Sequence, residues 1–181
     1  KKLVNWDTVL KTAISDLEVD QREVSSKLYY IKYKIENSKE YITIATTRPE
    51  TMLGDTAIAV NPSDDRYKKI VGKNAIIPIV ERKIKIIEDE YADPEQGTGA
   101  VKITPAHDFN DYDVGQRNSL EILNIFNEDG SINENAPKQF FGLDRFEARK
   151  KLIKLLIEKD FLVKEENIKN KVPYGDRSNS I

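Results

Sequence analysis

Two short segments, residues 46–55 and 97–112, contain most of the side chains in this chain that could carry out chemistry. The first reads Thr-Thr-Arg-Pro-Glu-Thr-Met-Leu-Gly-Asp, and the second reads Gly-Thr-Gly-Ala-Val-Lys-Ile-Thr-Pro-Ala-His-Asp-Phe-Asn-Asp-Tyr. In both segments a strand-like run ends in a group of polar and charged residues. We therefore expect two strand ends to converge on one small polar site with carboxylates, hydroxyls and two cations, Arg48 and Lys102.

The second segment places two polar residues on one face of a strand. Val101 and Ile103 alternate with Lys102 and Thr104, so the polar pair shares a face. An ordinary solvated strand face would explain this pattern without any function. However, Pro105 ends the strand and a helix begins soon after it, so the polar face points at a helix N-terminus, which is a natural position for polar ligand groups.

Two carboxylates, Asp108 and Asp111, stand three residues apart and lie on one side of the predicted helix. Helix capping explains both, with Asp108 as the N-cap and Asp111 in the first turn, where it interacts favourably with the helix dipole. The functional alternative is a carboxylate pair that binds a cationic or hydroxyl-bearing ligand. The two roles can coexist.

His107 is the only histidine, and the chain contains no cysteine. Histidine-rich metal hydrolases and thiolate metal sites need several such ligands, so the sequence predicts no metal site. An acyl-transfer triad would have to be built around His107 itself. This residue either orients the turn between strand and helix or takes part in binding or catalysis.

The composition limits the class of protein. The chain has 181 residues, enough for one core, and 29 basic against 31 acidic residues give a net charge of -2. No overall positive field attracts a polyanion, so any contact with RNA must be local or be delivered by a larger protein. No apolar run approaches the roughly 20 residues that span a bilayer. We expect a cytoplasmic protein that does not bind membranes.

Hydrophobic periodicity predicts more strands than helices, and the two do not alternate regularly. The sequence therefore predicts an α+β fold, with a mixed β-sheet or small β-barrel and a few helices packed around it. Residues 1–25 and 171–181 differ from the middle and are either arms of an inserted domain or simple frayed termini. Strands are expected at 26–35, 41–46, 56–60, 75–80, 83–87, 99–104 and 120–126, and helices at 64–71, 109–118 and 144–159.

The two polar segments resemble the signature stretches of the connective-peptide editing domain of class I aminoacyl-tRNA synthetases, and they are most similar to the valyl subgroup. The similarity extends to residues 3–7, 61–67 and 172–178. It implies an editing domain at 26–170, between an N-terminal insertion arm at 1–25 and a C-terminal arm at 171–181 that leads back to a catalytic body. The signatures for ATP chemistry in these enzymes are missing, so the resemblance implies a domain that cannot aminoacylate.

The resemblance implies hydrolysis of threonine from mischarged threonyl-tRNA(Val) by a positioned water. Asp111 would hold the α-ammonium group, Asp108 would accept a hydrogen bond from the threonine hydroxyl, and Lys102 would donate to the developing oxyanion. Together with Thr47, which lies where it could position the water, Lys102 and Asp111 are the expected catalytic residues. The expected substrate-binding residues are Thr46, Arg48, Thr51, Lys102, Thr104, His107, Asp108 and Asp111.

The resemblance also implies partners and cofactors. Editing would need no cofactor, whereas the parent enzyme uses ATP and Mg²⁺. The partners would be the 3′ end of tRNA(Val) carrying threonine and the rest of the parent synthetase, and the protein would be a monomer. Three alternatives remain open: a non-catalytic module that binds the tRNA acceptor end, an editing domain of the isoleucyl or leucyl type, and a purely structural insertion.

Overall fold

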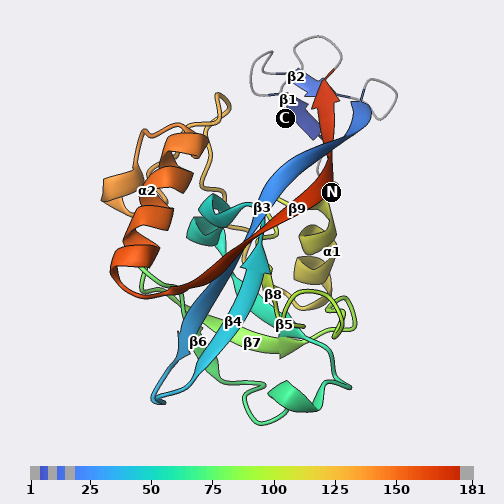
Figure 1. Cartoon of the computed structure of the whole chain (residues 1–181), viewed down its shortest axis with the longest axis vertical. Helices are drawn as coiled ribbons and strands as arrows, with labels where there is room; N and C mark the ends of the chain where they lie inside the picture. Colours follow the sequence, from blue (N-terminus) through green and yellow to red (C-terminus); the bar gives the residue numbers. More distant parts are fainter. Residues whose placement is uncertain (1–4, 8–11, 15–18, 176–181) are drawn as a thin grey trace.

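The long strand β3 (Val19–Ile35) pairs with three other strands in the computed structural model, which describes residues 5–7, 12–14 and 19–175 (Figure 1). It pairs antiparallel with β4 (Tyr41–Thr46), with β6 (Asn74–Ile76) and with β9 (Leu162–Gly175). Three neighbours are possible because β3 is long enough for each partner to occupy a different stretch or edge.

The sheet curls into a nearly closed mixed barrel. Its strands follow the order β4-β3-β6-β7-β5-β8, and the two ends of this order, β4 and β8, contact each other. Among the strands of the described residues, only the pair of β5 and β7 is parallel. This architecture confirms the predicted α+β class with a mixed sheet. The strands not yet defined are β5 (Ala57–Val60), β7 (Lys83–Glu88) and β8 (Val101–Ile103).

The strands predicted at 26–35 and 41–46 are confirmed and pair antiparallel, although β3 begins earlier, at Val19. Ile31, Tyr33 and Ile35 are buried in the core, whereas Lys34 between them is exposed. This alternation is the period of two that a half-buried strand requires.

The first part of β3 and the last part of β9 form a two-stranded ribbon that projects from the barrel (Figure 1). A short antiparallel pair, β1 (Asn5–Asp7) and β2 (Thr12–Ile14), completes the described structure. The predicted arm boundaries, at residues 25 and 171, fall within the ribbon. Parts of both arms lie outside the described residues, so the arms stay a prediction.

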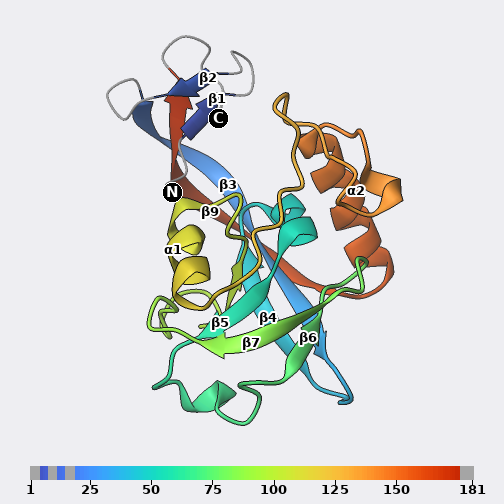
Figure 2. The ribbon, with the colours of Figure 1, turned by 180° about the vertical axis from the view of Figure 1, so that it is seen from behind.

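The described residues contain two α-helices and three 3₁₀ helices outside the strands. The 14-residue helix α2 (Arg145–Glu158) confirms the helix predicted at 144–159, and Asp144 caps it by accepting from the Phe146 amide. It packs against the 3₁₀ helix η2, which lies between α1 and α2 in both views (Figure 1, Figure 2). The other helices are α1 (Phe109–Arg117), η2 (Pro49–Gly54), η3 (Asp65–Tyr67) and η4 (Lys138–Phe140).

Three predicted elements are wrong or too long. The helix expected at 64–71 is only the single turn η3, and short helices have little stability of their own. The strand expected at 75–80 ends at Ile76, because Pro78 has no amide to donate and Ile79 has a positive φ of 70°.

The segment 120–126 is also not a strand, and its one ladder contact is an isolated bridge between Phe126 and Ile132. Side chains form hydrogen bonds with the backbone of this segment instead. The His107 ring accepts from the Ile125 amide, and the Asn133 side chain donates to the Asn124 carbonyl. In the part of the chain that the structure describes, no helix is long and apolar enough to cross a membrane.

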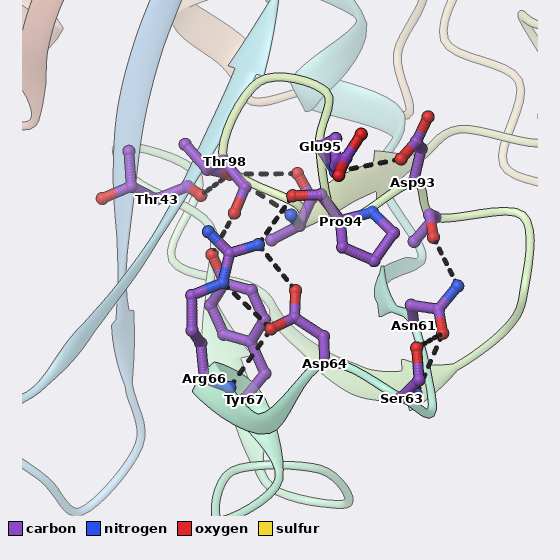
Figure 3. Close-up of polar contacts among 12 residues, drawn as sticks. Thr43, Asn61, Ser63, Asp64, Arg66, Tyr67, Asp93, Pro94, Glu95 and Thr98 are labelled. Atoms are coloured by element: carbon purple, nitrogen blue, oxygen red, sulfur yellow. Dashed lines mark hydrogen bonds and ion pairs between the residues drawn. The ribbon is translucent and has the colours of Figure 1, made fainter.

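A network around Arg66 fastens the loop at 89–100 to the barrel (Figure 3). The Arg66 guanidinium donates to both Asp64 oxygens, at 2.9 and 2.7 Å, and to the Pro94 carbonyl at 2.7 Å. The Tyr67 hydroxyl donates to the carbonyl of Thr98, and the Thr98 hydroxyl donates to the Thr43 carbonyl on β4 at 2.5 Å. The loop therefore reaches β8 from a fixed position.

Gly99 is required where this network meets the loop. Its φ is +83°, and a Cβ atom there would lie 2.5 Å from Arg66 Nη2 and 2.9 Å from Asp64 Oδ2. Gly72 has a similar φ of +86° but nothing within 4 Å of its Cβ position. A side chain would cause backbone strain at both glycines, but only at Gly99 would it also collide with the Arg66 network.

We predict that Gly99→Ala lowers the free energy of unfolding more than Gly72→Ala does. Each substitution places a side chain at positive φ, which costs about 1–3 kcal/mol. Only Gly99→Ala also displaces the Arg66–Asp64 pair. Urea unfolding of both variants measures the difference, and equal destabilisation would show that the network yields without cost.

Candidate functional site

The ammonium group of Lys102 lies at the centre of a buried polar cluster formed by η2 and β8. Its Nζ is 2.8 Å from Thr51 Oγ1, 2.5 Å from Thr104 Oγ1 and 2.7 Å from Asp55 Oδ1. Lys102 is 6% exposed and Thr104 is 1% exposed. The explanation of these residues as a solvated strand face is therefore wrong, and the two polar segments do converge as predicted.

Local structure explains how Thr51 reaches this cluster. Pro49 stands at the start of η2, where its fixed φ favours a helical turn and its missing amide is not needed. The turn brings the Thr51 amide to the Arg48 carbonyl at 3.1 Å, and the Thr51 hydroxyl donates to the same oxygen at 2.8 Å. The Thr51 oxygen is thereby held toward Lys102.

Asp55 is a central residue that the sequence analysis did not select. It is completely buried, and its Oδ1 accepts from Lys102 and from the Thr104 hydroxyl, each at 2.7 Å. Its Oδ2 accepts from the Tyr33 hydroxyl at 2.5 Å, and its backbone carbonyl accepts from Arg82 at 2.5 Å. Burial raises the pKa of Asp55, and the neighbouring Lys102 charge opposes this shift.

Asp108 and Asp111 stand at the start of α1, directly beyond Thr104. Asp108 is the N-cap, and its Oδ1 accepts from the amides of Asn110 and Asp111 at 2.8 and 3.1 Å. Asp111 is buried and accepts from the Thr104 amide at 2.9 Å. Burial, and then the charge of Asp108, raise the pKa of Asp111 to about 6. Capping is thus confirmed for Asp108, whereas Asp111 belongs to the buried cluster.

Tyr91 is a second residue that the sequence analysis missed. It lies on the loop that the Arg66 network fastens, and it is 38% exposed. Burial raises the pKa of its phenol, and the charges of Asp111 and Asp108 raise it further. Its position beside the two carboxylates depends on the fold of the loop, so nothing in the local sequence indicated it.

His107 is held in place at the turn between β8 and α1. Its Nε2 accepts from the Ile125 amide at 3.0 Å, and its ring packs edge-on against Phe126 at 4.6 Å between centroids. Burial, followed by the charges of Arg48 and Lys102, lowers the pKa of His107 to about 3. The ring is therefore neutral near pH 7. Of the two roles considered from the sequence, the structure favours orientation of the turn.

Arg48 joins the two predicted segments, because its Nη1 donates to the His107 carbonyl at 3.0 Å. Its own amide donates to the Thr46 hydroxyl at 3.0 Å. Thr47 lies between them and is half-buried. Direct hydrogen bonds thus unite Thr51, Thr104 and Lys102, whereas Thr46 and Thr47 lie at the margin beside Arg48.

This arrangement can bind a small ligand that carries both a cation and an oxygen. The carboxylates suit an ammonium group or a hydroxyl, and the buried ammonium of Lys102 suits an oxygen that gains negative charge. Over the described ranges of the chain, no three His, Asp or Glu side chains are grouped so that they could hold a metal ion. The residues favour polar binding and electrostatic stabilisation.

Comparison with known proteins places this geometry in a family. The family of leucyl-tRNA synthetase editing domains matches residues 67–143. Curated relatives include valine–tRNA ligases that align with all 181 residues, at 80% identity in Pelagibacter ubique and 53% in Thermotoga maritima. The chain spans only 21% of the length of either relative.

Solved structures share the fold. The chain resembles the crystal structure of a LeuRS connective-peptide domain, GlLeuRS-CP1, with a TM-score of 0.60 and 15% identity over 76% of this chain and 98% of that one. It also resembles the Agrobacterium radiobacter K84 agnB2 LeuRS in its ternary complex with tRNA and LeuAMS, with a TM-score of 0.56 and 21% identity. That match covers 86% of this chain and 21% of the other.

We predict that Asp108→Asn lowers the pKa of Asp111 from about 6 toward its ordinary value, because it removes the nearest negative charge. Asparagine caps helices as well as aspartate does, so α1 should persist. Titration of the carboxyl carbons by NMR measures this shift. Asp113→Asn, an exposed position on the same helix, is the matched control, and an equal shift in both variants would exclude a specific effect of Asp108.

The raised pKa of Asp111 also has a consequence for stability. Between about pH 4 and pH 6 the folded protein binds the Asp111 proton more tightly than the unfolded chain does. The contribution of this group to the free energy of unfolding therefore falls as the pH rises through that window. Asp111→Asn should remove this contribution, and urea unfolding at pH 4, 5, 6 and 7 compares the two slopes.

Proposed function

We propose that this chain, which belongs to the editing domains of class I aminoacyl-tRNA synthetases, hydrolyses the ester of mischarged threonyl-tRNA(Val) and releases threonine. The relatives that align with all 181 of its residues are valine–tRNA ligases. The observation that carries the proposal is the link between the buried Lys102 ammonium group and the start of α1: Thr104 accepts from Lys102 through its hydroxyl and donates to Asp111 through its amide. The aminoacyl ester would be bound between these groups.

The need for such a site follows from the shapes of the two amino acids. Threonine and valine have nearly the same volume, so a pocket built for valine cannot strongly reject threonine. A second site can discriminate in the opposite sense if it contains a polar group that only threonine satisfies. An acceptor that the bound substrate encloses and that valine leaves unpaired costs about 1–3 kcal/mol, which would protect the correct product roughly tenfold or better.

Two carboxylates would recognise the threonyl group. Asp111 would bind its α-ammonium group, as a buried carboxylate next to a cation becomes fully ionised. Asp108 uses Oδ1 for both capping bonds, so its Oδ2 would accept from the threonine hydroxyl. Arg48, Thr51 and Thr104 would contact the aminoacyl carbonyl and the terminal adenosine.

Hydrolysis would need a positioned water and stabilisation of the oxyanion, because an aminoacyl ester is already activated. Lys102 would supply the stabilising charge. Three protein oxygens already surround its ammonium group, so the developing oxyanion would replace one threonine contact. Thr46 and Thr47, beside Arg48, would position the water or the ribose, and no cofactor would be required.

The wider context is also part of the proposal. The parent synthetase, with its own ATP and Mg²⁺ chemistry, would anchor the tRNA, since the net charge of -2 offers no general attraction for RNA. Residues 1–25 and 171–181 would connect the domain at 26–170 to that enzyme, which would be cytoplasmic and monomeric. The alternatives are an acceptor-end binding module without hydrolysis and editing of another amino acid.

We predict that the chain binds a stable threonyl-adenosine conjugate at least about tenfold more tightly than the valyl conjugate, because only threonine satisfies Asp108. Asp108→Asn keeps the helix cap and the shape of the side chain but offers a different polar group to the ligand. It should abolish the preference for threonine. Calorimetry with both conjugates measures this, and Asp113→Asn is the control.

Hydrolysis itself is tested with the chain in place of the matching segment of the Pelagibacter ubique valine–tRNA ligase, which is 80% identical over all 181 residues. Deacylation of threonyl-tRNA(Val) that disappears in Asp111→Ala supports the proposal. Preferential threonyl binding without deacylation would identify an acceptor-end module. Equal binding of both conjugates would exclude threonine editing.

Binding should also depend on pH in a defined direction. Asp111 titrates at about 6 in the free protein, so it becomes ionised between pH 5 and pH 7. The affinity for the threonyl conjugate should rise over this range, because the ionised carboxylate attracts the ammonium group. Calorimetry at four pH values should show this rise in the wild type and a flat profile in Asp111→Asn.

A further inference from the structure

Asp55 is fully buried, and no step of the proposed reaction uses it. Three donors converge on its carboxylate: the Tyr33 hydroxyl, the Thr104 hydroxyl and the Lys102 ammonium group. Arg82 holds the backbone on the same side, because its guanidinium donates to the carbonyls of Asp55 and Leu53 at 2.5 and 3.1 Å. The carboxylate is therefore fixed from three directions.

The chemistry of Lys102 determines the direction of the hydrogen bonds around it. An ammonium group can only donate, so the Thr104 hydroxyl presents a lone pair to Lys102 and donates its single proton to Asp55. The Thr51 hydroxyl donates to the Arg48 carbonyl, so it also accepts from Lys102. Each threonine therefore offers its oxygen, and not its proton, to the ammonium group.

The three contacts of Lys102 differ in strength. The contact with Asp55 is a charge-assisted bond between two ions, which is roughly twice as strong as a bond to a neutral group, whereas Thr51 and Thr104 are neutral acceptors. An entering substrate oxygen would therefore replace a threonine contact. The Asp55 contact would persist and would act as the pivot of the lysine side chain.

We propose that Asp55 is a positioning residue of the site, which holds the Lys102 ammonium group and orients the Thr104 hydroxyl while substrate is bound. This inference rests on the proposed function. Asp55 itself does not touch the substrate. Its effect on the reaction passes through Lys102 and Thr104, so it should change the rate of hydrolysis more than the affinity for substrate.

Asp55→Asn tests the assignment in the chimeric synthetase, because asparagine keeps the shape and an acceptor oxygen but removes the charge. Loss of one oxyanion donor typically lowers kcat about 10²–10³-fold, and Lys102 is still present here, so we expect a fall of about 10–100-fold. KM should stay within about threefold, since groups that act only in the transition state leave KM unchanged.

A double-mutant cycle separates positioning from a general loss of structure. In a Lys102→Met background, Asp55→Asn should change kcat by less than about threefold, because the effect of Asp55 requires the lysine. Independent, multiplicative effects of the two substitutions on kcat would overturn the proposal. A change in KM alone would also overturn it.

Tyr33→Phe is a milder second variant and decides the question if Asp55→Asn does not fold. It removes only the bond to Asp55 Oδ2 and leaves every charge in place. We expect kcat to fall about threefold to tenfold with KM unchanged, because Asp55 gains freedom to rotate. Tyr30→Phe is the matched control on the same strand, since its hydroxyl faces the exposed Glu166 and its activity should equal that of the wild type.

The outcomes distinguish the two levels of inference. A wild-type chimera that does not deacylate threonyl-tRNA(Val) contradicts the proposed function. An active wild type, with Asp55→Asn and Tyr33→Phe variants that keep the wild-type kcat, leaves the function standing and overturns the role of Asp55.

Discussion

The buried ion pair between Lys102 and Asp55 is the constraint on which the site depends. An unpaired ammonium group in the interior is very costly, so Lys102 can be buried only with a carboxylate close to it. That carboxylate in turn needs Tyr33 and Thr104 to satisfy its remaining positions. The buried charge of Lys102 on β8 therefore requires a carboxylate at the end of η2 and a hydroxyl donor on β3.

The barrel meets this demand because its strands bring distant parts of the sequence to one place. Tyr33 comes from β3, Asp55 from the residue after η2, and Lys102 from the last strand in the order. The loop before β8 is fastened independently by Arg66, so the position of Lys102 does not rest on the three-residue strand alone. Rigid support of this kind is what a preorganised electrostatic site requires.

Local patterns were sufficient where an element carries its own signal. The alternation in 26–35 and the capped apolar stripe of 144–159 both gave correct elements, and the two polar motifs indicated the residues that surround Lys102. Prediction failed where partners far away in the chain decide the outcome. Residues 164–167 of β9 are all polar and exposed, so only the pairing with β3 makes this stretch a strand. Asp55 was not selected from the sequence, because its contacts with Tyr33 and Lys102 join segments that are far apart in the chain.

The ribbon of β3 and β9 has a consequence for how such a domain is carried by a larger protein. Val19 lies directly opposite Gly175 in the antiparallel register, and paired strands are roughly 5 Å apart. In any host chain that contains the domain as an insertion, the points of entry and exit therefore lie as close together as the two ends of a very short loop. The host therefore loses little chain entropy by accommodating an insertion of this length.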